Sequence, residues 1–496
     1  MTPKSSLLHY LAEHAARSPD RVAMHFRDRT FTYREVEEAA ARCRGALAAH
    51  GVRGGERVAL LMSDSPEMIF AFLGVIGAGA IAVPCNTLLP TDALAYVLKD
   101  SGAKLTVVSA EHAANAKAAG AARVVNGNAL LEGKPAAMAA FDRDTPCLVV
   151  YTSGSTGQPK GAVHAHGHLA CPVEAVAKNV YDLNPDDRLF SAPRLYFAYG
   201  LGNSVLVPLG AGASTILLPE RPTPALVAEV FRKYRPTIFF GVPTMFRMLI
   251  EYVRQGNALD TSSLRFSTSA GEVLPTATWN EWKEITGSEI LESIGTTELL
   301  YAFMHNQPGH NRPGSAGKVL EGYECRLEDE AGTVIRGPGR GNLLVRGGSA
   351  ITHYLNNPHK SAQTIHDGWV RTGDVFRRDA DGYYFFEGRS DDLFKCSGMW
   401  VSPFEVEEAV ARHPAVLEVA VIAEPDATGA TIPAAYVILR PGMAAAEAEI
   451  MEQAAKTLPR FKQPKRVHFV AELPRTPTGK LQRFKLRGRS PDSFSS

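Results

Sequence analysis

Short apolar runs alternate with longer amphipathic segments along the first half of the chain. Strand-like runs and helix-like segments follow one another at residues 57–63, 66–77, 80–84, 91–102 and 105–109. The same alternation returns farther on, with STILLP, TIFFGVP and LRFSTSAG around ALVAEVFRKY and TMFRMLIEYVRQG. Alternation of this kind is typical of parallel α/β layers. The pattern therefore predicts an α/β fold with two similar lobes.

The pattern changes from about Tyr323 onward. Short β-type runs separated by Gly and Pro turns predict a β subdomain there. After residues 388–392 come helix-like segments at 403–414 and 448–459 and strand-like runs at 416–425 and 434–442. We therefore predict a large N-terminal domain over residues 1–390 and a small α+β C-terminal domain over residues 391–496.

Residues 68–85 (MIFAFLGVIGAGAIAVPC) carry no charge and reach the length of a membrane span. Asp64 and Ser65 precede Pro66, as at a helix N-terminus with proline in the first turn. Three glycines interrupt the run before the strand-like AIAVP. We therefore expect a buried helix followed by a buried strand, and no membrane contact.

Composition and the spacing of cysteine and histidine exclude several classes of function. The 496 residues contain 53 Lys and Arg against 52 Asp and Glu, so no net charge draws the chain to nucleic acid or an anionic membrane. Six scattered cysteines match neither a disulfide framework nor a zinc site. His164, His166 and His168 lack a partner at metal-ligand spacing. The first 20 residues lack the apolar core of a signal peptide, so we expect a cytoplasmic protein.

The most specific local signal is residues 151–161 (YTSGSTGQPKG), after the strand-like CLVVY. Glycines let backbone N–H groups approach an anion, hydroxyl groups add donors, and Lys160 adds a positive charge. The pattern predicts a polyphosphate site rather than a flexible linker. Its candidate residues are Thr152, Ser153, Gly154, Ser155, Thr156, Gly157 and Lys160.

Two standard nucleotide loops do not fit. A Walker A loop needs G-x-x-x-x-G-K-[ST], but Pro159 stands in place of its second glycine and Gly161 follows the lysine. A dinucleotide fingerprint needs G-x-G-x-x-G, and after Gly200 and Gly202 its third glycine is replaced by Val205. Neither a P-loop nor an NAD site is expected.

Four further motifs follow the loop: 294–298 (IGTTE), 371–374 (RTGD), 388–392 (GRSDD) and 474–480 (PRTPTGK). In these motifs and their order, the chain resembles the adenylate-forming superfamily of acyl-CoA synthetases, adenylation domains and luciferases. The resemblance covers essentially the whole chain. It implies that ATP activates a carboxylic acid, because a carboxylate is a poor electrophile until AMP supplies a stable leaving group. It also implies Mg²⁺ as cofactor.

The resemblance implies roles for individual residues. Glu298 resembles the Mg²⁺ ligand, assisted by Thr156, although a solvated glutamate that caps a helix is the alternative. Thr297 resembles the hydroxyl donor to the α-phosphate. Lys480 resembles the lysine that bridges the substrate carboxylate and the α-phosphate. These implied catalytic residues are Lys480, Thr297 and Glu298.

The remaining nucleotide contacts are implied in the same way. Asp374 and Arg389 resemble the pair that contacts the ribose, with a surface ion pair as the alternative. Gly271 and Glu272 resemble the segment beside the adenine. Gly295 and Thr296 complete the implied nucleotide-binding set.

The small domain of this superfamily is expected to adopt two orientations. By position Asp391 resembles the hinge. Residues 395–400 resemble the lining of the coenzyme A tunnel, with Lys395, Ser397, Gly398 and Trp400 as candidates. From Lys456 to Arg489, eleven Lys and Arg stand against one acidic residue, a bias that suits phosphate groups. Aromatics here are few, so nucleic acid is not expected.

Within the superfamily, residues 191–203 (SAPRLYFAYGLGN), with GVPTMF, SAGEVLP and WVSPFEVE, most resemble the benzoate-CoA ligase branch. A flat aromatic acid needs an apolar slot. The implied pocket residues are Tyr196, Phe197, Ala198, Tyr199, Gly200 and Tyr301, with ordinary core packing as the alternative. Tyr301 stands where that branch is expected to have histidine. The ring substituents of the acid therefore stay open, and so does a heteroaromatic acid.

Together the motifs predict an ATP-dependent aryl-CoA ligase. It would convert benzoate or a close relative to the acyl-AMP, releasing pyrophosphate, and transfer the acyl group to coenzyme A, releasing AMP. Expected partners are the aromatic acid, ATP and coenzyme A, and a homodimer stays open. The alternatives are a ligase for another small acid (heteroaromatic, alicyclic or short aliphatic), one that loads a carrier protein, and a catalytically silent homologue.

Overall fold

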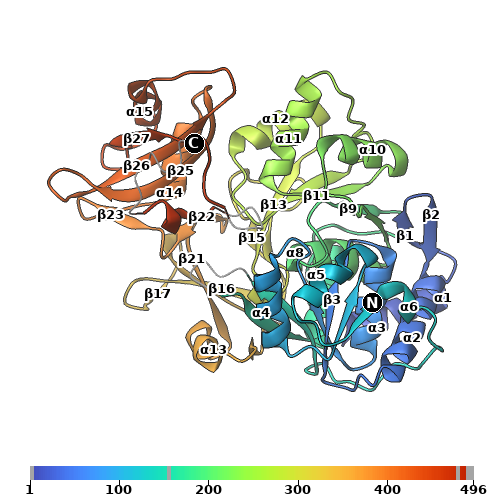
Figure 1. The fold of residues 1–496 in the computed structure, drawn as a ribbon. Helices are drawn as coiled ribbons and strands as arrows, with labels where there is room; N and C mark the ends of the chain where they lie inside the picture. Colours follow the sequence, from blue (N-terminus) through green and yellow to red (C-terminus); the bar gives the residue numbers. More distant parts are fainter. Residues whose placement is uncertain (1–4, 153–157, 476–480, 488–496) are drawn as a thin grey trace. The chain divides into compact units, whose positions relative to one another are not determined.

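The computed structural model of the chain describes residues 5–152, 158–475 and 481–487. The chain divides into two compact units (Figure 1). The first contains Met1–Cys325 and Leu344–Val370, and the second contains Arg326–Leu343 and Arg371–Ser496. The predicted boundary between residues 390 and 391 lies inside the second unit and stays a prediction.

A large sheet of the first unit has the strand order β15-β14-β13-β12-β11-β9-β10-β1-β2. The strands β1, β10, β9, β11, β12 and β13 run parallel, and β2, β14 and β15 add antiparallel pairs at the edges. The strands are β1 (Val22–Phe26), β2 (Arg29–Thr32), β9 (Arg188–Ser191), β10 (Ser214–Leu217), β11 (Ile238–Gly241), β12 (Phe266–Ser269), β13 (Ile290–Gly295), β14 (Ala302–His305) and β15 (Lys318–Val319).

A second sheet of this unit has the order β19-β8-β7-β4-β3-β5-β6. Here β7, β4, β3, β5 and β6 are parallel, while β8 and β19 pair antiparallel. The strands are β3 (Arg57–Leu61), β4 (Ile81–Pro84), β5 (Leu105–Val108), β6 (Val124–Asn126), β7 (Pro146–Thr152), β8 (Lys160–Ala165) and β19 (His353–Tyr354). The two sheets confirm the predicted pair of α/β lobes.

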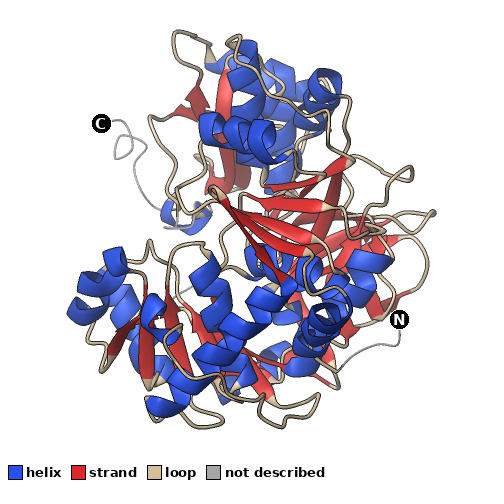
Figure 2. Ribbon diagram, turned by 90° about the vertical axis from the view of Figure 1, so that its right-hand side faces the viewer, coloured by secondary structure: helices blue, strands red, loops and turns tan. Residues whose placement is uncertain are grey.

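Helices flank these strands, as Figure 2 shows. They are α1 (Leu7–Arg17), α2 (Tyr33–Ala49), α3 (Pro66–Gly77), α4 (Thr91–Ser101), α5 (Ala113–Ala118), α6 (Gly127–Leu130), α7 (His166–Pro172), α8 (Ala198–Leu201), α9 (Val207–Ala211), α10 (Pro224–Tyr234), α11 (Pro243–Arg254), α12 (Thr276–Thr286) and α13 (Pro358–Thr364). Short 3₁₀ turns lie at η1 (Ala110–His112) and η4 (Thr297–Leu299), and π-helical turns at η2 (Val173–Lys178) and η3 (Gly202–Leu206).

The uncharged stretch 68–85 folds as predicted into a buried helix and a buried strand. Ser65 caps α3, since its hydroxyl accepts a hydrogen bond from the backbone N–H of Met68, and Pro66 opens the helix. The chain then leaves α3 through Gly79, which has a positive φ of 73°, and enters β4. Among the described residues, the helices are all too short or too polar to cross a membrane.

Aromatic side chains form the core between the large sheet and helices α10, α11 and α12. Phe239 of β11 lies 5.5 Å from the ring of Phe246, which in turn lies 5.0 Å from that of Trp282. All three side chains are fully buried. Burial of each contributes about 1.5–3 kcal/mol to folding, so this cluster fixes the helices against the sheet.

A third sheet has the order β17-β16-β18-β21-β20, and β22 pairs with β21. It confirms the predicted β subdomain. Its strands are β16 (Tyr323–Glu328), β17 (Val334–Ile335), β18 (Gly339–Gly347), β20 (Ile365–His366), β21 (Trp369–Arg378) and β22 (Tyr384–Arg389).

The C-terminal part of the second unit is the predicted small α+β fold. Strands β25 (Val416–Pro425), β26 (Thr431–Leu439) and β27 (Arg466–Phe469) form a sheet, accompanied by α14 (Pro403–Ala411), α15 (Glu447–Ala455) and the 3₁₀ turn η5 (Arg483–Lys485). A separate hairpin joins β23 (Phe394–Cys396) to β24 (Met399–Val401). Ser397 and Gly398, at its tip, both have positive φ, as a tight two-residue hairpin turn requires.

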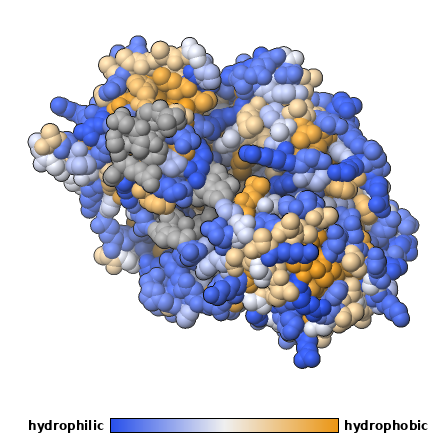
Figure 3. All heavy atoms as spheres, viewed as in Figure 1, coloured by the Kyte–Doolittle hydropathy of each residue, from blue (hydrophilic) through white to orange (hydrophobic). Residues whose placement is uncertain are grey.

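Hydrophilic residues cover most of the face seen in Figure 3, and apolar residues gather there in separate patches. Large exposed apolar side chains such as Leu88, Met399 and Phe484 come from different elements. The six cysteines are free thiols, in agreement with the lack of a disulfide pattern in the sequence, and four of them are buried.

Asp187 joins three parallel strands at their amino ends. It directly precedes β9, and its carboxylate accepts hydrogen bonds from Thr237 Oγ1, just before β11, and from Arg265 NH1, just before β12, both at 2.7 Å. The backbone N–H of Asn184 adds a third. The side chain of Asp187 is 2% exposed. This buried carboxylate therefore aligns β9, β11 and β12.

We predict that Asp187→Ala destabilises the first unit by about 3 kcal/mol, because Arg265 and Thr237 lose a buried partner. Urea unfolding followed by tryptophan emission measures the change. The neighbouring Asp186→Ala is the control, since the Asp186 side chain is 91% exposed. Equal midpoints for the two variants would contradict the role given to Asp187.

Candidate active site

The predicted phosphate loop connects two neighbouring antiparallel strands. Thr152 at the end of β7 pairs with Lys160 at the start of β8. The loop candidates Ser153, Gly154, Ser155, Thr156 and Gly157 lie outside the described residues, as does Lys480. The strand-loop-strand connection differs from the strand-loop-helix of a P-loop, in agreement with the missing Walker A pattern.

The IGTTE motif ends β13 and continues into the turn η4. After η4 the chain reverses at Leu300, which has φ 63° and ψ −41° although it is a buried leucine. The backbone N–H of Tyr301 donates to the carbonyl of Leu299 at 2.7 Å. These features define a γ-turn with positive φ, a rare and strained conformation.

Gly295 makes room for this reversal. A Cβ atom at Gly295 would lie 2.3 Å from the carbonyl oxygen of Tyr301, so no other residue fits without a shift of the backbone. The sequence prediction assigned Gly295 to nucleotide binding. The structure shows that the position also needs glycine for the approach of β14 to β13.

Every carbonyl of η4 accepts a hydrogen bond from a segment distant in the sequence. His164 Nε2 donates to the carbonyl of Thr297 at 2.8 Å, and the backbone N–H of Ile351 donates to that of Glu298 at 2.8 Å. Ser349 Oγ donates to the carbonyl of Leu299 at 2.7 Å. The backbone of η4, which we call the acidic turn because it carries Glu298, is therefore held by three separate segments.

His164 is held as a neutral donor. Burial, followed by the charge of His168, lowers the pKa of His164 to about 3. Since a carbonyl oxygen can only accept, the proton lies on Nε2. His166 is engaged elsewhere, since its Nδ1 lies 3.0 Å from Ser6 Oγ and its ring stacks on Phe141 at 3.7 Å. The histidine run thus serves packing and positioning.

The Glu298 side chain is half-buried, and one of its carboxylate oxygens accepts a hydrogen bond. The hydroxyl of Tyr354 donates to Glu298 Oε1 at 2.5 Å. Mg²⁺ is commonly bound by one or two carboxylates together with substrate phosphates. Within the described residues, no three or more His, Cys, Asp or Glu side chains gather to hold a metal. A single carboxylate on a turn that contacts β7 fits such a phosphate-bound Mg²⁺.

Two of the predicted pocket residues stack on each other. The rings of Tyr199 and Tyr301 lie 6.1 Å apart with an angle of 28° between their planes. The hydroxyl of Tyr301 donates to Asn203 Oδ1 at 2.5 Å. A Cβ at Gly202 would lie 2.2 Å from the Tyr301 ring. Glycine at 202 is therefore what admits a tyrosine at 301.

The hydroxyl groups of Tyr181, Tyr199 and Tyr301 all form hydrogen bonds with buried side chains. His305 Nδ1 must donate to the carbonyl of Asn306, so Nε2 accepts from the hydroxyl of Tyr181 at 3.0 Å. Tyr199 is bonded to Thr268 Oγ1 at 2.8 Å. Burial raises the pKa values of all three tyrosines, and it lowers the pKa of His305 to about 4.

Sequence reasoning missed Tyr181, Thr268 and His305. Asn203 is part of the motif of residues 191–203, but nothing in the sequence indicates that its side chain accepts a hydrogen bond from Tyr301. No local pattern marks the other three, because they meet only in the folded chain. Thr268 lies on β12 and His305 on β14 of the large sheet, whereas Tyr181 lies in the turn that follows η2.

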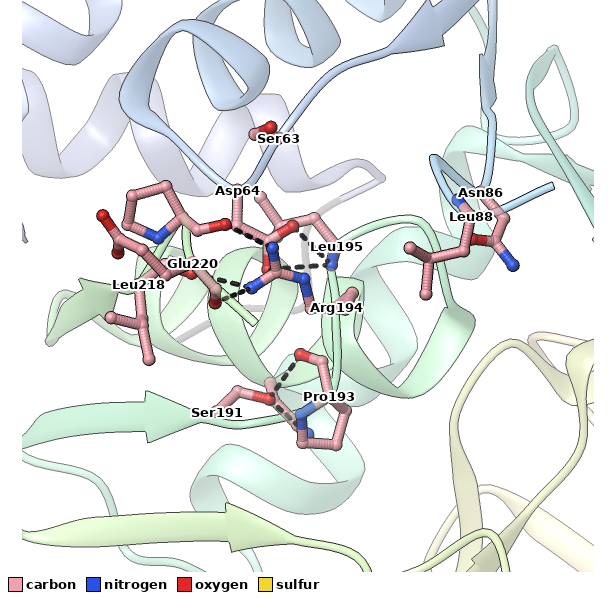
Figure 4. Close-up of polar contacts among 12 residues, drawn as sticks. Ser63, Asp64, Asn86, Leu88, Ser191, Pro193, Arg194, Leu195, Leu218 and Glu220 are labelled. Atoms are coloured by element: carbon pink, nitrogen blue, oxygen red, sulfur yellow. Dashed lines mark hydrogen bonds and ion pairs between the residues drawn. The ribbon is translucent and has the colours of Figure 1, made fainter. Parts of the chain in front are cut away.

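Figure 4 shows how the segment that carries Tyr196 is anchored. Arg194 donates to the backbone carbonyls of Leu218, Pro219 and Glu220 at 2.8, 2.5 and 3.0 Å. The carboxylate of Asp64 accepts from the backbone N–H of Leu195 at 3.3 Å and lies 3.7 Å from Arg194 Nε. Burial raises the pKa of Asp64 to about 6, against the effect of Arg194.

The segment then bends tightly into α8. A Cβ at Gly200 would lie 1.9 Å from the carbonyl oxygen of Arg194, so the bend requires glycine. The rings of Tyr196 and Phe197 lie 4.6 Å apart. The places predicted for these residues and Ala198 in an acyl pocket stay predictions.

In the second unit the structure brings together the two residues predicted to contact ribose. Asp374 on β21 pairs across the sheet with Arg389 on β22, whose NH1 donates to Asp374 Oδ1 at 2.8 Å. Asp374 is 5% exposed. Gly373, with φ 74°, leaves space for the guanidinium, since a Cβ there would lie 2.8 Å from it. The ion pair is present, with Asp374 buried and the Arg389 side chain 43% exposed, and the contact of both residues with ribose stays a prediction.

The predicted coenzyme A residues lie on the hairpin of β23 and β24 and just before it. Trp400 Nε1 donates to Glu330 Oε1 at 2.8 Å, and Lys395 Nζ lies 4.6 Å from the centre of the Trp400 ring. Asp391 is exposed. Gly271 and Glu272, in the first unit, are exposed after β12, and Gly271 has φ 90°. The roles assigned to all of them stay predictions.

Comparison with known proteins decides the family. The AMP-binding enzyme family matches residues 11–355, and the C-terminal domain of AMP-binding enzymes matches residues 405–480. The chain belongs to the AMP-binding enzyme family. This membership confirms the resemblance drawn from the five motifs, and the α/β lobes with a small C-terminal fold are those of the family's solved structures.

Members of known activity are similar over nearly the whole chain. A benzoate–CoA ligase of Thauera aromatica is 39% identical, with 92% of this chain and 90% of that protein aligned. An anthranilate CoA ligase solved in complex with anthranoyl-AMP has a TM-score of 0.91 at 36% identity, covering 100% of this chain and 98% of its own. A benzoate CoA ligase from Burkholderia xenovorans LB400 has a TM-score of 0.88 at 35% identity, covering 97% and 99%.

The buried histidines predict how stability depends on pH. Burial lowers the pKa of His164 to about 3 and those of His166, His168 and His305 to about 4, from 6.5. The unfolded chain therefore binds more protons, and stability that is complete above pH 6.5 is lost as the pH falls toward 4. Each histidine contributes a slope of about 1.4 kcal/mol per pH unit. The raised pKa of Asp64 opposes this slope below pH 6.

We expect the urea midpoint of the first unit to fall steadily from pH 7 to pH 5. His305→Asn should reduce the slope by about one proton. His359→Asn on the exposed surface of α13 is the control and should leave the slope unchanged. A midpoint that rises on acidification would contradict the neutral state of these histidines.

Proposed function

We propose that the chain is an ATP-dependent aryl-CoA ligase. An oxygen of the aromatic carboxylate attacks the α-phosphorus of ATP, the bond to the β-phosphate breaks, and pyrophosphate leaves. The thiol of coenzyme A then attacks the acyl carbon of the acyl-AMP, and AMP leaves as the thioester forms. The observation that carries the proposal is the similarity, over nearly the entire chain, to proteins named as benzoate– and anthranilate–CoA ligases.

The proposal assigns a binding role to each of the following residues. Glu298 and Thr156 would hold Mg²⁺, which neutralises charge on the phosphate oxygens. Thr297 would donate to the α-phosphate, and Asp374 with Arg389 would bind the ribose hydroxyls. Lys480 would draw the carboxylate and the α-phosphate together.

The geometry of the first unit supports an aromatic substrate. Tyr301 follows Glu298 by three residues, so one turn carries both the proposed metal ligand and a stacked aromatic pair. Aromatic faces suit a flat ring. The hydroxyls of Tyr181 and Tyr301 already donate to His305 and Asn203. A ring hydroxyl could not accept a hydrogen bond from either tyrosine without displacing these bonds, so the described contacts favour an unsubstituted ring over hydroxybenzoates.

The test is acid-dependent pyrophosphate exchange, followed by release of AMP on addition of coenzyme A. We expect benzoate to give the highest kcat/KM in a panel with hydroxybenzoates, aminobenzoates, furoate and cyclohexanecarboxylate. Exchange without any release of AMP by coenzyme A would instead indicate a ligase that loads a carrier protein. The absence of exchange with every acid would indicate a catalytically silent homologue.

Lys480→Ala should separate the two half-reactions. Loss of a preorganised charge costs adenylation about 10² to 10³ in rate. Formation of benzoyl-CoA from supplied benzoyl-AMP should persist, because the acyl phosphate bond already exists. Lys99→Ala, on the exposed surface of α4, is the control and should affect neither step. Equal loss of both half-reactions would contradict the assigned role.

A further inference from the structure

Tyr354 reaches the acidic turn from a distant segment. It is the last residue of the short strand β19, which pairs with β8 so that Tyr354 lies opposite Ala162. The side chain is 4% exposed, and its hydroxyl donates to Glu298 Oε1 at 2.5 Å. Ser361 Oγ accepts a hydrogen bond from the backbone N–H of Tyr354 at 2.9 Å. The donor is therefore held by its own backbone contacts before any ligand binds.

The segment that carries Tyr354 fixes Glu298 at two points. Ile351 binds the backbone carbonyl of Glu298, and Tyr354 binds its carboxylate. With one carboxylate oxygen held, rotation of the side chain is restricted. The bond from Tyr354 engages Oε1 and leaves Oε2 outside that contact.

The same frame includes β8, which connects the phosphate loop to the turn. β8 begins with Lys160 directly after the loop, carries His164 to the carbonyl of Thr297, and pairs with β19. Tyr354 therefore belongs to a closed arrangement of β8, β19 and η4. In this arrangement Lys160, at the start of β8, and Glu298, on η4, belong to segments that hydrogen bonds connect.

We infer that Tyr354 orients the Glu298 carboxylate toward the Mg²⁺ of bound MgATP. This inference rests on the proposed function, because Glu298 is a metal ligand only in that proposal. Tyr354 is a positioning residue and does not contact the reactants. A hydroxyl donor suits this task, since it directs one oxygen without bringing a positive charge that would compete with the cation.

Tyr354→Phe tests the inference, because it keeps the buried ring and removes only the hydroxyl. Calorimetric titration of ATP binding at increasing Mg²⁺, without any acid, should show a half-saturating Mg²⁺ concentration about tenfold to a hundredfold higher than in the unchanged protein. ATP binding in the presence of EDTA should be unchanged. Pyrophosphate exchange should recover at high Mg²⁺.

Tyr436→Phe is the matched control. Tyr436 is also buried and also donates its hydroxyl to a glutamate, Glu424, at 2.7 Å, but within the sheet of β25, β26 and β27. It should leave the Mg²⁺ dependence unchanged. An unshifted Mg²⁺ titration for Tyr354→Phe, an equal shift for Tyr436→Phe, or parallel loss of ATP binding in EDTA would each overturn the inference.

The design separates this inference from the proposed function. If no aromatic acid supports pyrophosphate exchange but the Mg²⁺ titration shifts, the proposed substrate class fails and the role of Tyr354 stands. If exchange with benzoate is strong and the titration does not shift, the role of Tyr354 fails alone.

Discussion

The structure of the site depends on a chain reversal that takes place over a single residue. β13 ends at Gly295, η4 follows, and Leu300 turns the chain back with positive φ so that β14 can pair with β13. A non-glycine residue in such a conformation costs about 1–3 kcal/mol. Hydrogen bonds to the three carbonyls of η4, from His164, Ser349 and Ile351, offset this cost. The turn is rigid because distant segments hold it, not because its own sequence favours it.

The reversal also connects two parts of the site that are separate in the sequence. Tyr301 comes directly after Leu300, and its backbone packs on Gly295 while its ring packs on Gly202. Each glycine is required by the same tyrosine. A change at position 301 would therefore alter the aromatic pair with Tyr199 and also the backbone beside Glu298. The position proposed to contact the acid and the one proposed to bind the metal thus share one turn.

Much of the fold could be predicted from the sequence, because hydrophobic alternation and caps are local signals. The helix at 66–77, the strands around it and the small α+β fold all appeared where the pattern placed them. Motifs also pointed to Glu298 and to Asp374 and Arg389 as a pair, and the register of β21 and β22 places the last two opposite each other. The division predicted at residue 391 and the roles of the site residues are not decided by the fold.

Long-range contacts could not be predicted. β19 is only two residues long, so no periodicity marks it, and the contact of Tyr354 with Glu298 exists only through its pairing with β8. Likewise His164, His166 and His168 stand in one run, and only the structure shows that His164 serves η4 while His166 packs on Phe141. The π-helical turn η3 was not predicted either, because such turns are rare and no local pattern marks them.

Neutral groups hold both the backbone of η4 and the side chain of Glu298. The groups described around η4 are an imidazole kept neutral by burial, two hydroxyls and a backbone N–H. Charged donors would be costly to bury and would neutralise Glu298 before any ligand arrived. Neutral donors hold the carboxylate in place without adding a positive charge beside it. The contacts at η4 thus supply orientation, and in the proposed function the attraction for Mg²⁺ would come from the Glu298 carboxylate.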